Sequence, residues 1–195
     1  MALVSKNFIE DTQGSAIDVV PIVVVANLVD DKFEVLDCFS NKKVQIRDTD
    51  DNIISSKEII SKISGVKNNV DYDNKKIKIN TFRFSIYDYY DVTKKLTSSE
   101  SYILKDGSNP TNSFIGKYVI LYYKTPNTSN IDLNKGILSL GDSSCSIMFT
   151  GIVNRITQTD KSISIQAEDF TQQYIQDKKI PVNKVGDLDQ VIKDN

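Results

Sequence analysis

The stretch Cys145–Pro181 constrains the fold of this chain more than any other segment. It contains an apolar run that reaches Gly151 and continues in alternation, a polar turn at Thr159–Lys161, and a second alternating run that starts at Ser162. Because successive side chains of a strand point to opposite faces, each alternating run gathers its apolar residues on one face. The stretch therefore predicts an antiparallel β-hairpin whose return strand turns one apolar row into a core: Ile163, Ile165 and Ala167.

The other strand candidates are rich in β-branched and aromatic residues, which favour a pleated surface. In chain order they are Val19–Asn27, Phe33–Phe39, Val44–Arg47, Lys75–Asp88, Gly116–Lys124 and the weaker Gly136–Leu140. The acidic pair Asp30-Asp31 is typical of a turn, so the first two segments are expected to form a hairpin. Within residues 75–88 the alternation changes phase near Asn80, which indicates either a β-bulge or two strands that meet at a corner.

Three segments predict helices. In Ser55–Ile63 a serine can cap the first turn and three isoleucines share one helical face. After the return strand, Asp169 can cap a short helix through Gln176 with Phe170 and Tyr174 on its buried side. The last residues, Gly186–Asn195, predict the start of a further helix, which either continues into a longer polypeptide or docks on a partner.

Together these patterns predict a mainly β protein, a β-rich α+β chain built as an antiparallel barrel or sandwich with short helices. Residues 1–15 are polar and patternless, which predicts an extended or mobile arm. Residues 16–64 are expected to form a β segment with a short helix, joined to a β-barrel over residues 65–181. Residues 182–195 are expected to form a C-terminal helical extension.

Charge and hydropathy exclude two classes of partner. The chain has 24 basic and 26 acidic side chains, which are interspersed, and its net charge is −2. Without a basic block or stripe, binding to nucleic acid or to an anionic membrane surface is not indicated. The longest apolar run, Val19–Leu28, contains Pro21 and Asn27 and is too short to span a bilayer. We therefore expect no nucleic-acid partner and no membrane.

The chain contains no histidine, which removes the commonest general base and metal ligand. Ser143–Ser146 therefore has no histidine to activate a nucleophile. The two cysteines, Cys38 and Cys145, lie far apart in the sequence. They are expected to be reduced and to pack as small apolar groups. The alternative is a single disulfide between them, which the sequence leaves undecided. We expect no catalytic residue, no cofactor and no metal.

Two acidic clusters are candidate sites. Asp48–Asn52 resembles the opening of a calcium loop, but Ile53 and Ile59 stand where the EF-hand pattern needs glycine and glutamate. An acidic, solvated turn is the prediction there, and an oxygen-ligand site of another type stays open. Glu168 and Asp169 are adjacent on a strand end, so their carboxylates are expected to point to opposite sides and not to converge on a substrate.

One segment is dense in aromatic residues: Phe82, Phe84, Tyr87, Tyr89 and Tyr90. Packing in a core and along a sheet edge is the expected role of these rings. The alternative is a stacking platform for a sugar or for single-stranded nucleic acid, although the second of these also needs a basic groove.

The order of these segments resembles the baseplate or tail hub family of contractile-tailed bacteriophages, including the Mu-type hub. The family pattern runs from an alternating strand through a polar excursion to a glycine-led strand, and then to a hairpin and a helix. Its counterparts here are Lys75–Ile86, Gly116–Tyr123, Phe149–Val153, Ile163–Asp169 and Phe170–Tyr174. The resemblance covers residues 65–181 and leaves the N-terminal residues as extra strands or a partner-binding arm.

The resemblance implies a tail-tube-like β-barrel that packs beside copies of itself in a ring. Such a hub joins the tail tube to the spike and wedges, so the implied partners are further copies of this chain and tail tube, spike or wedge proteins. It also implies assembly in the host cytoplasm, a place in the tail of the virion, and no catalytic residue.

Two other functions stay open at this point. A ligand- or carbohydrate-binding β-module would use the aromatic residues between Phe82 and Tyr90 as its platform. A histidine-free hydrolase would need carboxylates that converge in a cleft.

Overall fold

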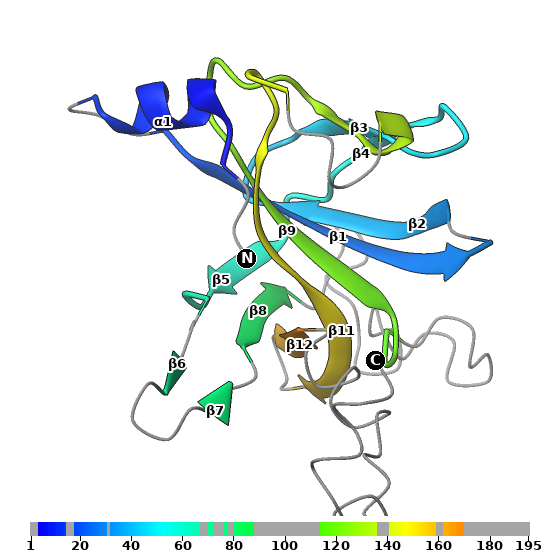
Figure 1. Cartoon of the computed structure of the whole chain (residues 1–195). Helices are drawn as coiled ribbons and strands as arrows, with labels where there is room; N and C mark the ends of the chain where they lie inside the picture. Colours follow the sequence, from blue (N-terminus) through cyan, green and yellow to red (C-terminus); the bar gives the residue numbers. More distant parts are fainter. Residues whose placement is uncertain are drawn as a thin grey trace, which may run out of the picture.

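The computed structural model describes residues 4–14, 18–30, 32–66, 70–71, 76–77, 80–87, 114–135, 141–158 and 162–169 (Figure 1). Its elements are α1 (Lys6–Thr12), β1 (Val20–Val29), β2 (Lys32–Ser40), β3 (Gln45–Arg47), β4 (Ile53–Ser55), β5 (Ile60–Ile63), β6 (Val70–Asp71), β7 (Lys76–Ile77), β8 (Thr81–Tyr87), β9 (Tyr118–Lys124), β10 (Ile131–Asp132), a 3₁₀ turn (Leu133–Lys135), β11 (Ser146–Gln158) and β12 (Ser162–Asp169). The predicted mainly β class is therefore confirmed.

Most of the strands form one seven-stranded antiparallel sheet in the order β2-β1-β9-β11-β12-β8-β5. A three-stranded sheet, β10-β3-β4, and a two-stranded sheet, β6-β7, complete the described part. The predicted hairpins β1–β2 and β11–β12 are both present. Strands from residues 16–64 and from residues 65–181 are neighbours in the same sheet, so the N-terminal segment joins the rest of the fold directly.

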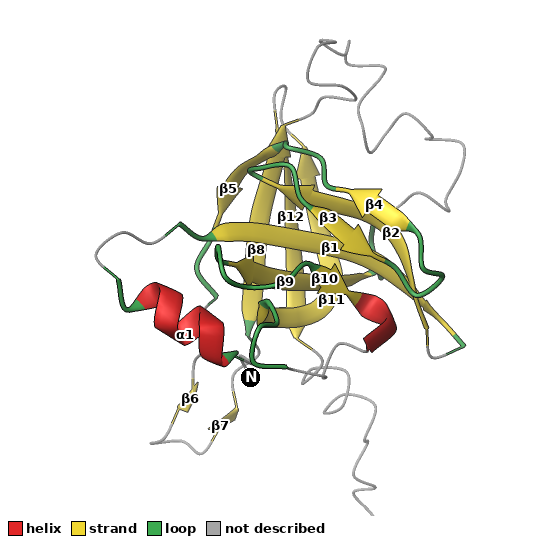
Figure 2. Cartoon of the chain, turned by 90° about the horizontal axis from the view of Figure 1, so that it is seen from above, coloured by secondary structure: helices red, strands yellow, loops and turns green. Residues whose placement is uncertain are grey.

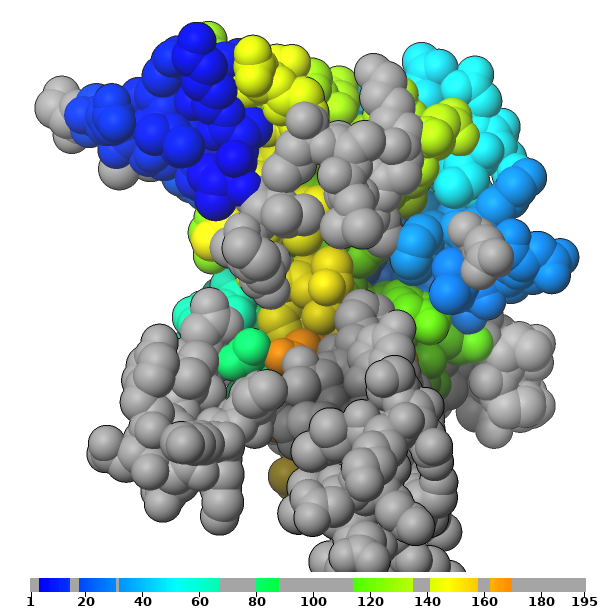
Figure 3. Space-filling model, in the orientation of Figure 1, coloured from blue at the N-terminus to red at the C-terminus, as the bar shows by residue number. Residues whose placement is uncertain are grey.

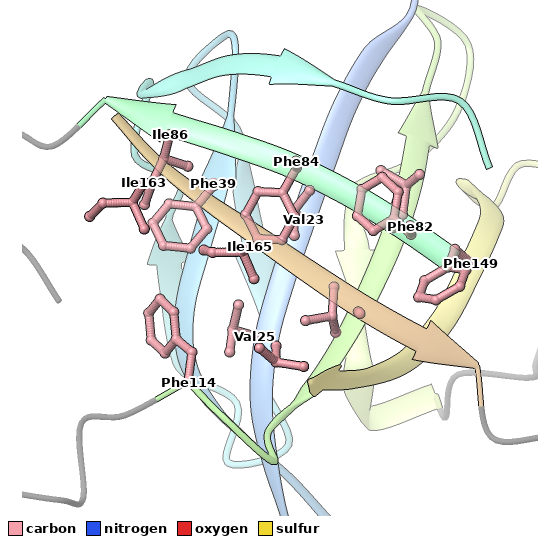
Figure 4. Close-up of a cluster of buried hydrophobic side chains, with 14 of the residues drawn as sticks. Val23, Val25, Phe39, Phe82, Phe84, Ile86, Phe114, Phe149, Ile163 and Ile165 are labelled. Carbon is pink, nitrogen blue, oxygen red and sulfur yellow. The ribbon is translucent and has the colours of Figure 1, made fainter. Parts of the chain in front are cut away.

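The seven-stranded sheet is strongly rolled, so that its two ends face each other across a core. In Figure 2, β1 crosses β8 and β12, which belong to the other end of the same sheet. The ring of Phe39 on β2 lies 6.2 Å from the ring of Phe84 on β8. We call the buried cluster between these ends the inner core; its labelled side chains in Figure 4 are Val23, Val25, Phe39, Phe82, Phe84, Ile86, Phe114, Phe149, Ile163 and Ile165.

A second cluster, the outer core, lies on the opposite face of the sheet, where β3, β10 and the 3₁₀ turn cover it. Along β1, Val23 and Val25 point into the inner core, while Ile22 and Val24 point into the outer core. β1 is thus buried on both faces, which explains why its sequence is a continuous apolar run rather than an alternating one.

The β11–β12 hairpin needs its glycine for close packing. A Cβ atom on Gly151 would lie 2.2 Å from the carbonyl oxygen of Glu168 and 2.7 Å from Cζ of Phe149. The return strand behaves as its alternation predicts, because Ile163, Ile165 and Ala167 are fully buried. Near Asn80 the phase change separates two strands, β7 and β8, which belong to different sheets.

The predicted closed barrel is wrong for the described part of the chain. β2 and β5 are the two edges of the seven-stranded sheet and do not form a ladder with each other. Within the described residues, the backbone pairing between these regions is an isolated parallel bridge of Phe39 with Lys57. The short length of β5, and a register irregularity between Ile60 and Lys62, leave too little regular strand to complete the cylinder.

The predicted helix over Ser55–Ile63 is also wrong, because this segment contributes to β4 and β5. Ile59 is buried in the inner core, and Ile60 and Ile63 pack against the same cluster. Burial of these isoleucines beside β8 overrides a spacing that also fits a helical face.

The N-terminal arm, predicted to be extended or mobile, contains α1 instead. Ser5 caps this helix by accepting a hydrogen bond from the Phe8 amide (3.4 Å), and Phe8 is buried. The Asn7 amide donates to the carbonyl of Asp142 (2.9 Å), which attaches the helix to the body. The helices predicted after Asp169 and in Gly186–Asn195, and the weak strand Gly136–Leu140, lie outside the described residues.

Candidate functional site

The end of the β1–β2 hairpin stands out from the sheet (Figures 1 and 3). β1 pairs with β2 as far as Val29, whereas its ladder with β9 ends at Ala26. Residues 27–29 therefore have a strand neighbour on one side only in the described part of the chain. We call residues 27–30 and 32–34 the hairpin tip.

The hairpin tip exposes apolar side chains on both of its faces. Leu28 and Val29 are 40% and 50% exposed, and as successive strand residues they point in opposite directions. Leu28 lies opposite Phe33 in the ladder, and the Phe33 ring meets the Tyr118 ring edge-on at 5.6 Å. A two-stranded ribbon with exposed apolar side chains is stabilised when a partner buries them.

A second feature, which we call the seam, is the place where β2 meets the segment before β5. The Ser40 amide donates to the carbonyl of Lys57 (3.0 Å), and the Lys57 amide donates to the carbonyl of Cys38 (2.8 Å). The Lys57 ammonium donates to Oδ2 of Asp37 at 2.8 Å. Oδ1 of the same carboxylate accepts from the Cys38 amide (2.9 Å).

The seam holds a charge that is nearly removed from water. The Asp37 side chain is 8% exposed, and that of Lys57 is 42% exposed. Burial raises the pKa of the Asp37 carboxyl, although Lys57 acts in the opposite direction. Sequence reasoning missed this pair because its members lie far apart in the chain and no local pattern connects them.

The acidic segment Asp48–Asn52 forms the predicted solvated turn. Oδ1 of Asp48 accepts from the amides of Asp50 (2.9 Å) and Asn52 (2.8 Å), and Asp51 pairs with the guanidinium of Arg47 (2.7 Å). Desolvation raises the pKa of the Asp48 carboxyl, but these hydrogen bonds outweigh it, so the pKa is lowered overall. The carboxylates thus stabilise the turn itself, and the described residues contain no group of three potential metal ligands.

The other polar candidates have structural partners. Asp169 exchanges two hydrogen bonds with the backbone of Asn80, through its amide (3.1 Å) and its Oδ2 (3.2 Å). Glu168 lies beside it on β12, so the two carboxylates point to opposite faces. In the serine cluster, Oγ of Ser144 accepts from the Gly141 amide (2.8 Å) and Oγ of Ser146 accepts from the Ser5 amide (3.3 Å).

The aromatic segment divides between core and surface. Phe82 and Phe84 are buried in the inner core, where their rings stack at 5.6 Å, and Phe82 also contacts Phe149 at 5.3 Å. Tyr87 is 46% exposed. Tyr89 and Tyr90 lie outside the described residues, so the two phenylalanines at least belong to the core and not to a stacking platform.

Both cysteines are free and buried in the outer core. The alternative of a disulfide between Cys38 and Cys145 is therefore wrong. Burial raises the pKa of the Cys38 thiol to about 12, with Asp37 acting in the same direction. Burial also raises the pKa of Cys145, whose Sγ donates to the carbonyl of Ser129 (3.0 Å). Such thiols are poor nucleophiles, which fits a packing role.

Comparison with protein-family models and with curated proteins found no match to this chain. No helix within the described residues is long and apolar enough to cross a membrane.

Proposed function

We propose that this chain is a virion structural protein of a bacteriophage tail, a hub or hub-like ring component that joins the tail tube to the baseplate or spike. It works by self-association and by docking tail tube, spike or wedge proteins. The role is mechanical, so the proposal assigns no reaction and no cofactor. Its place is the virion, after assembly in the host cytoplasm.

One observation carries the proposal. Four of the five segments on which the hub resemblance rests contribute the strands β8, β9, β11 and β12, which lie side by side in the order β9-β11-β12-β8. The start of the first segment forms β7 in another sheet, and the fifth, Phe170–Tyr174, lies outside the described residues. Gly151, the glycine of the hub-like pattern, is the residue that lets β11 and β12 pack closely. A sequence pattern that converges on one continuous piece of sheet supports a shared architecture.

Two further features favour self-association. Within the described residues, β2 and β5 are the two edges of the rolled sheet, with Ser56–Lys57 beside part of β2, and the hairpin tip exposes Leu28 and Val29. A ring of identical subunits needs one surface that fits a different surface of its neighbour. The hairpin tip and the β5 edge are separate surfaces at opposite ends of the strand order.

The burial of Phe82 and Phe84 argues against the alternative of a ligand- or carbohydrate-binding module. Its platform needs exposed, coplanar rings, whereas Phe82 and Phe84 fill the inner core. Hydrolysis by paired carboxylates is not advanced either, because Glu168 and Asp169 diverge.

Native mass spectrometry and light scattering of the purified full chain, up to about 100 µM, test the proposal. We expect one discrete oligomer of several copies, visible as a ring by electron microscopy. A chain that stays monomeric over this range, and that does not bind tail tube or spike proteins encoded beside it, would contradict the proposal.

A further inference from the structure

The outer edge of β2 is the position at which another strand could extend the seven-stranded sheet. A short segment of the same chain, Ser56–Lys57, occupies part of that edge. Lys57 forms a parallel bridge with Phe39, through backbone hydrogen bonds of 3.0 and 2.8 Å to Ser40 and Cys38. We call Ser56–Lys57 the cover segment, because it satisfies edge groups that an added strand would otherwise use.

The buried carboxylate of Asp37 favours a positively charged group in any segment that covers the β2 edge. Asp37 is 8% exposed, and a buried carboxylate without a partner is costly. Lys57 supplies the compensating ammonium at 2.8 Å. Any other strand on this edge therefore has to bring a cation to the same place.

The cover segment is two residues long and pairs with β2 through an isolated bridge. Beyond this bridge and the Lys57–Asp37 pair, it is held by Ser56. The Oγ of Ser56 lies 2.8 Å from Oγ of Ser40, accepts from the Val44 amide (2.8 Å) and donates to the Lys42 carbonyl (3.2 Å), and the Ser56 amide donates to the Val44 carbonyl (2.8 Å). The bridge is isolated, whereas β1 and β2 are joined along eight residue pairs. Local opening should therefore occur at the seam before the β1–β2 ladder breaks.

We propose that the cover segment is an autoinhibitory contact that blocks strand addition at the β2 edge. When it is released, the edge pairs with the cover segment of a second copy of this chain. A second copy fits because it carries the same cover segment with the same lysine, the charge complement of Asp37. This inference rests on the self-association proposed above and adds its regulation.

A reversible lock tests the inference. The double variant Ser40→Cys/Ser56→Cys, made with Cys38→Ala to prevent mispairing, places two thiols where the hydroxyl oxygens are 2.8 Å apart. Oxidation should tie the cover segment to β2. We expect the oxidised form to need a concentration at least about tenfold higher than its reduced form to assemble.

The opposite change is Lys57→Met, which removes the cation and leaves Asp37 unpaired. We expect faster hydrogen exchange in the peptide that contains residues 38–40. Because a second copy of this variant also lacks the cation that pairs with Asp37, self-association should be weaker than that of the wild type. The matched control is Lys42→Met, because Lys42 pairs with Asp18 at 2.7 Å on the exposed surface. Circular dichroism establishes that each variant folds; if Lys57→Met does not, the oxidised and reduced lock decide the question.

The outcomes separate the two proposals. Equal assembly of oxidised and reduced lock overturns the autoinhibitory contact and leaves the ring proposal standing. Association of Lys57→Met that equals or exceeds that of the wild type also overturns it, because the second copy would then not be supplying Lys57 to Asp37. If the wild type and the reduced lock are both monomeric, self-association itself fails, and this inference fails with it.

Discussion

The absence of a Cβ atom at Gly151 allows β11 and β12 to pack closely. Alanine would bring its Cβ within 2.2 Å of the Glu168 carbonyl oxygen, which belongs to the backbone of β12 and cannot move aside. We expect Gly151→Ala to lower the free energy of unfolding by about 1–3 kcal/mol or more, as overpacked sites do. Urea denaturation measures the loss.

The control for this prediction is Gly65→Ala. A Cβ at Gly65 meets nothing within 4 Å. The free energy of unfolding should then change by no more than about 0.5 kcal/mol. Similar losses for the two variants would show that glycine flexibility, and not the contact with Glu168, is what matters at Gly151.

The raised pKa of Asp37 predicts how its contribution to the free energy of unfolding changes with pH. Because burial raises its pKa above the ordinary 3.8, the folded state binds the proton more tightly than the unfolded state. The stabilisation that this provides is complete below the ordinary pKa and is lost as the pH rises through the raised value. The unfolding free energy of the wild type, minus that of Asp37→Asn, should therefore fall as the pH rises above 3.8. A rise over that range would mean that attraction to Lys57 outweighs burial.

At the scale of the element, the hairpin tip can be tested apart from the fold. Val29 is half exposed and lies beyond the last β1–β9 pair, so Val29→Lys should leave the free energy of unfolding within about 0.5 kcal/mol of the wild type. If the tip contacts a neighbouring copy, the added charge should weaken self-association by about tenfold or more, measured by analytical ultracentrifugation.

Ile53→Lys is the matched control for the hairpin tip. Ile53 is 63% exposed and lies on β4, in the three-stranded sheet. It should leave the oligomer unchanged. Equal weakening by both substitutions would point to a general effect of surface charge and would remove the tip from the proposed interface.

The helix wrongly predicted over residues 55–63 illustrates how a short element is decided. Three isoleucines at positions 59, 60 and 63 fit one face of a helix, and they equally fit a strand with an irregular register. The pairing of β5 with β8 brings these residues to the inner core. A single turn of helix could not have offered backbone partners to that edge of β8.

At the scale of the whole molecule, the two cores share strands and should unfold together. β1 and β9 each contribute residues to both: Val119 and Leu121 of β9 point into the inner core, and Ile120 and Tyr122 into the outer core. We expect a single transition in urea.

Cys38 and Cys145 report on the outer core, while far-ultraviolet circular dichroism reports on the whole sheet. Both thiols should be unreactive toward Ellman's reagent in the native state at pH 8, because they are buried and their pKa values are raised. Their exposure should follow the loss of dichroism. Thiol reactivity that precedes this loss would show that the outer core opens independently.

The sequence by itself determined most strands, the β11–β12 hairpin and the buried row of its return strand, because alternation and β-branched composition act within a few residues. It also determined the turn character of Asp48–Asn52, whose hydrogen bonds are local. Only the tertiary structure decided that the rolled sheet stays open, that residues 60–63 form a strand, and that Asp37 meets Lys57. These outcomes depend on how far the sheet curls and which distant edges then approach, and no local pattern of side chains specifies that distance.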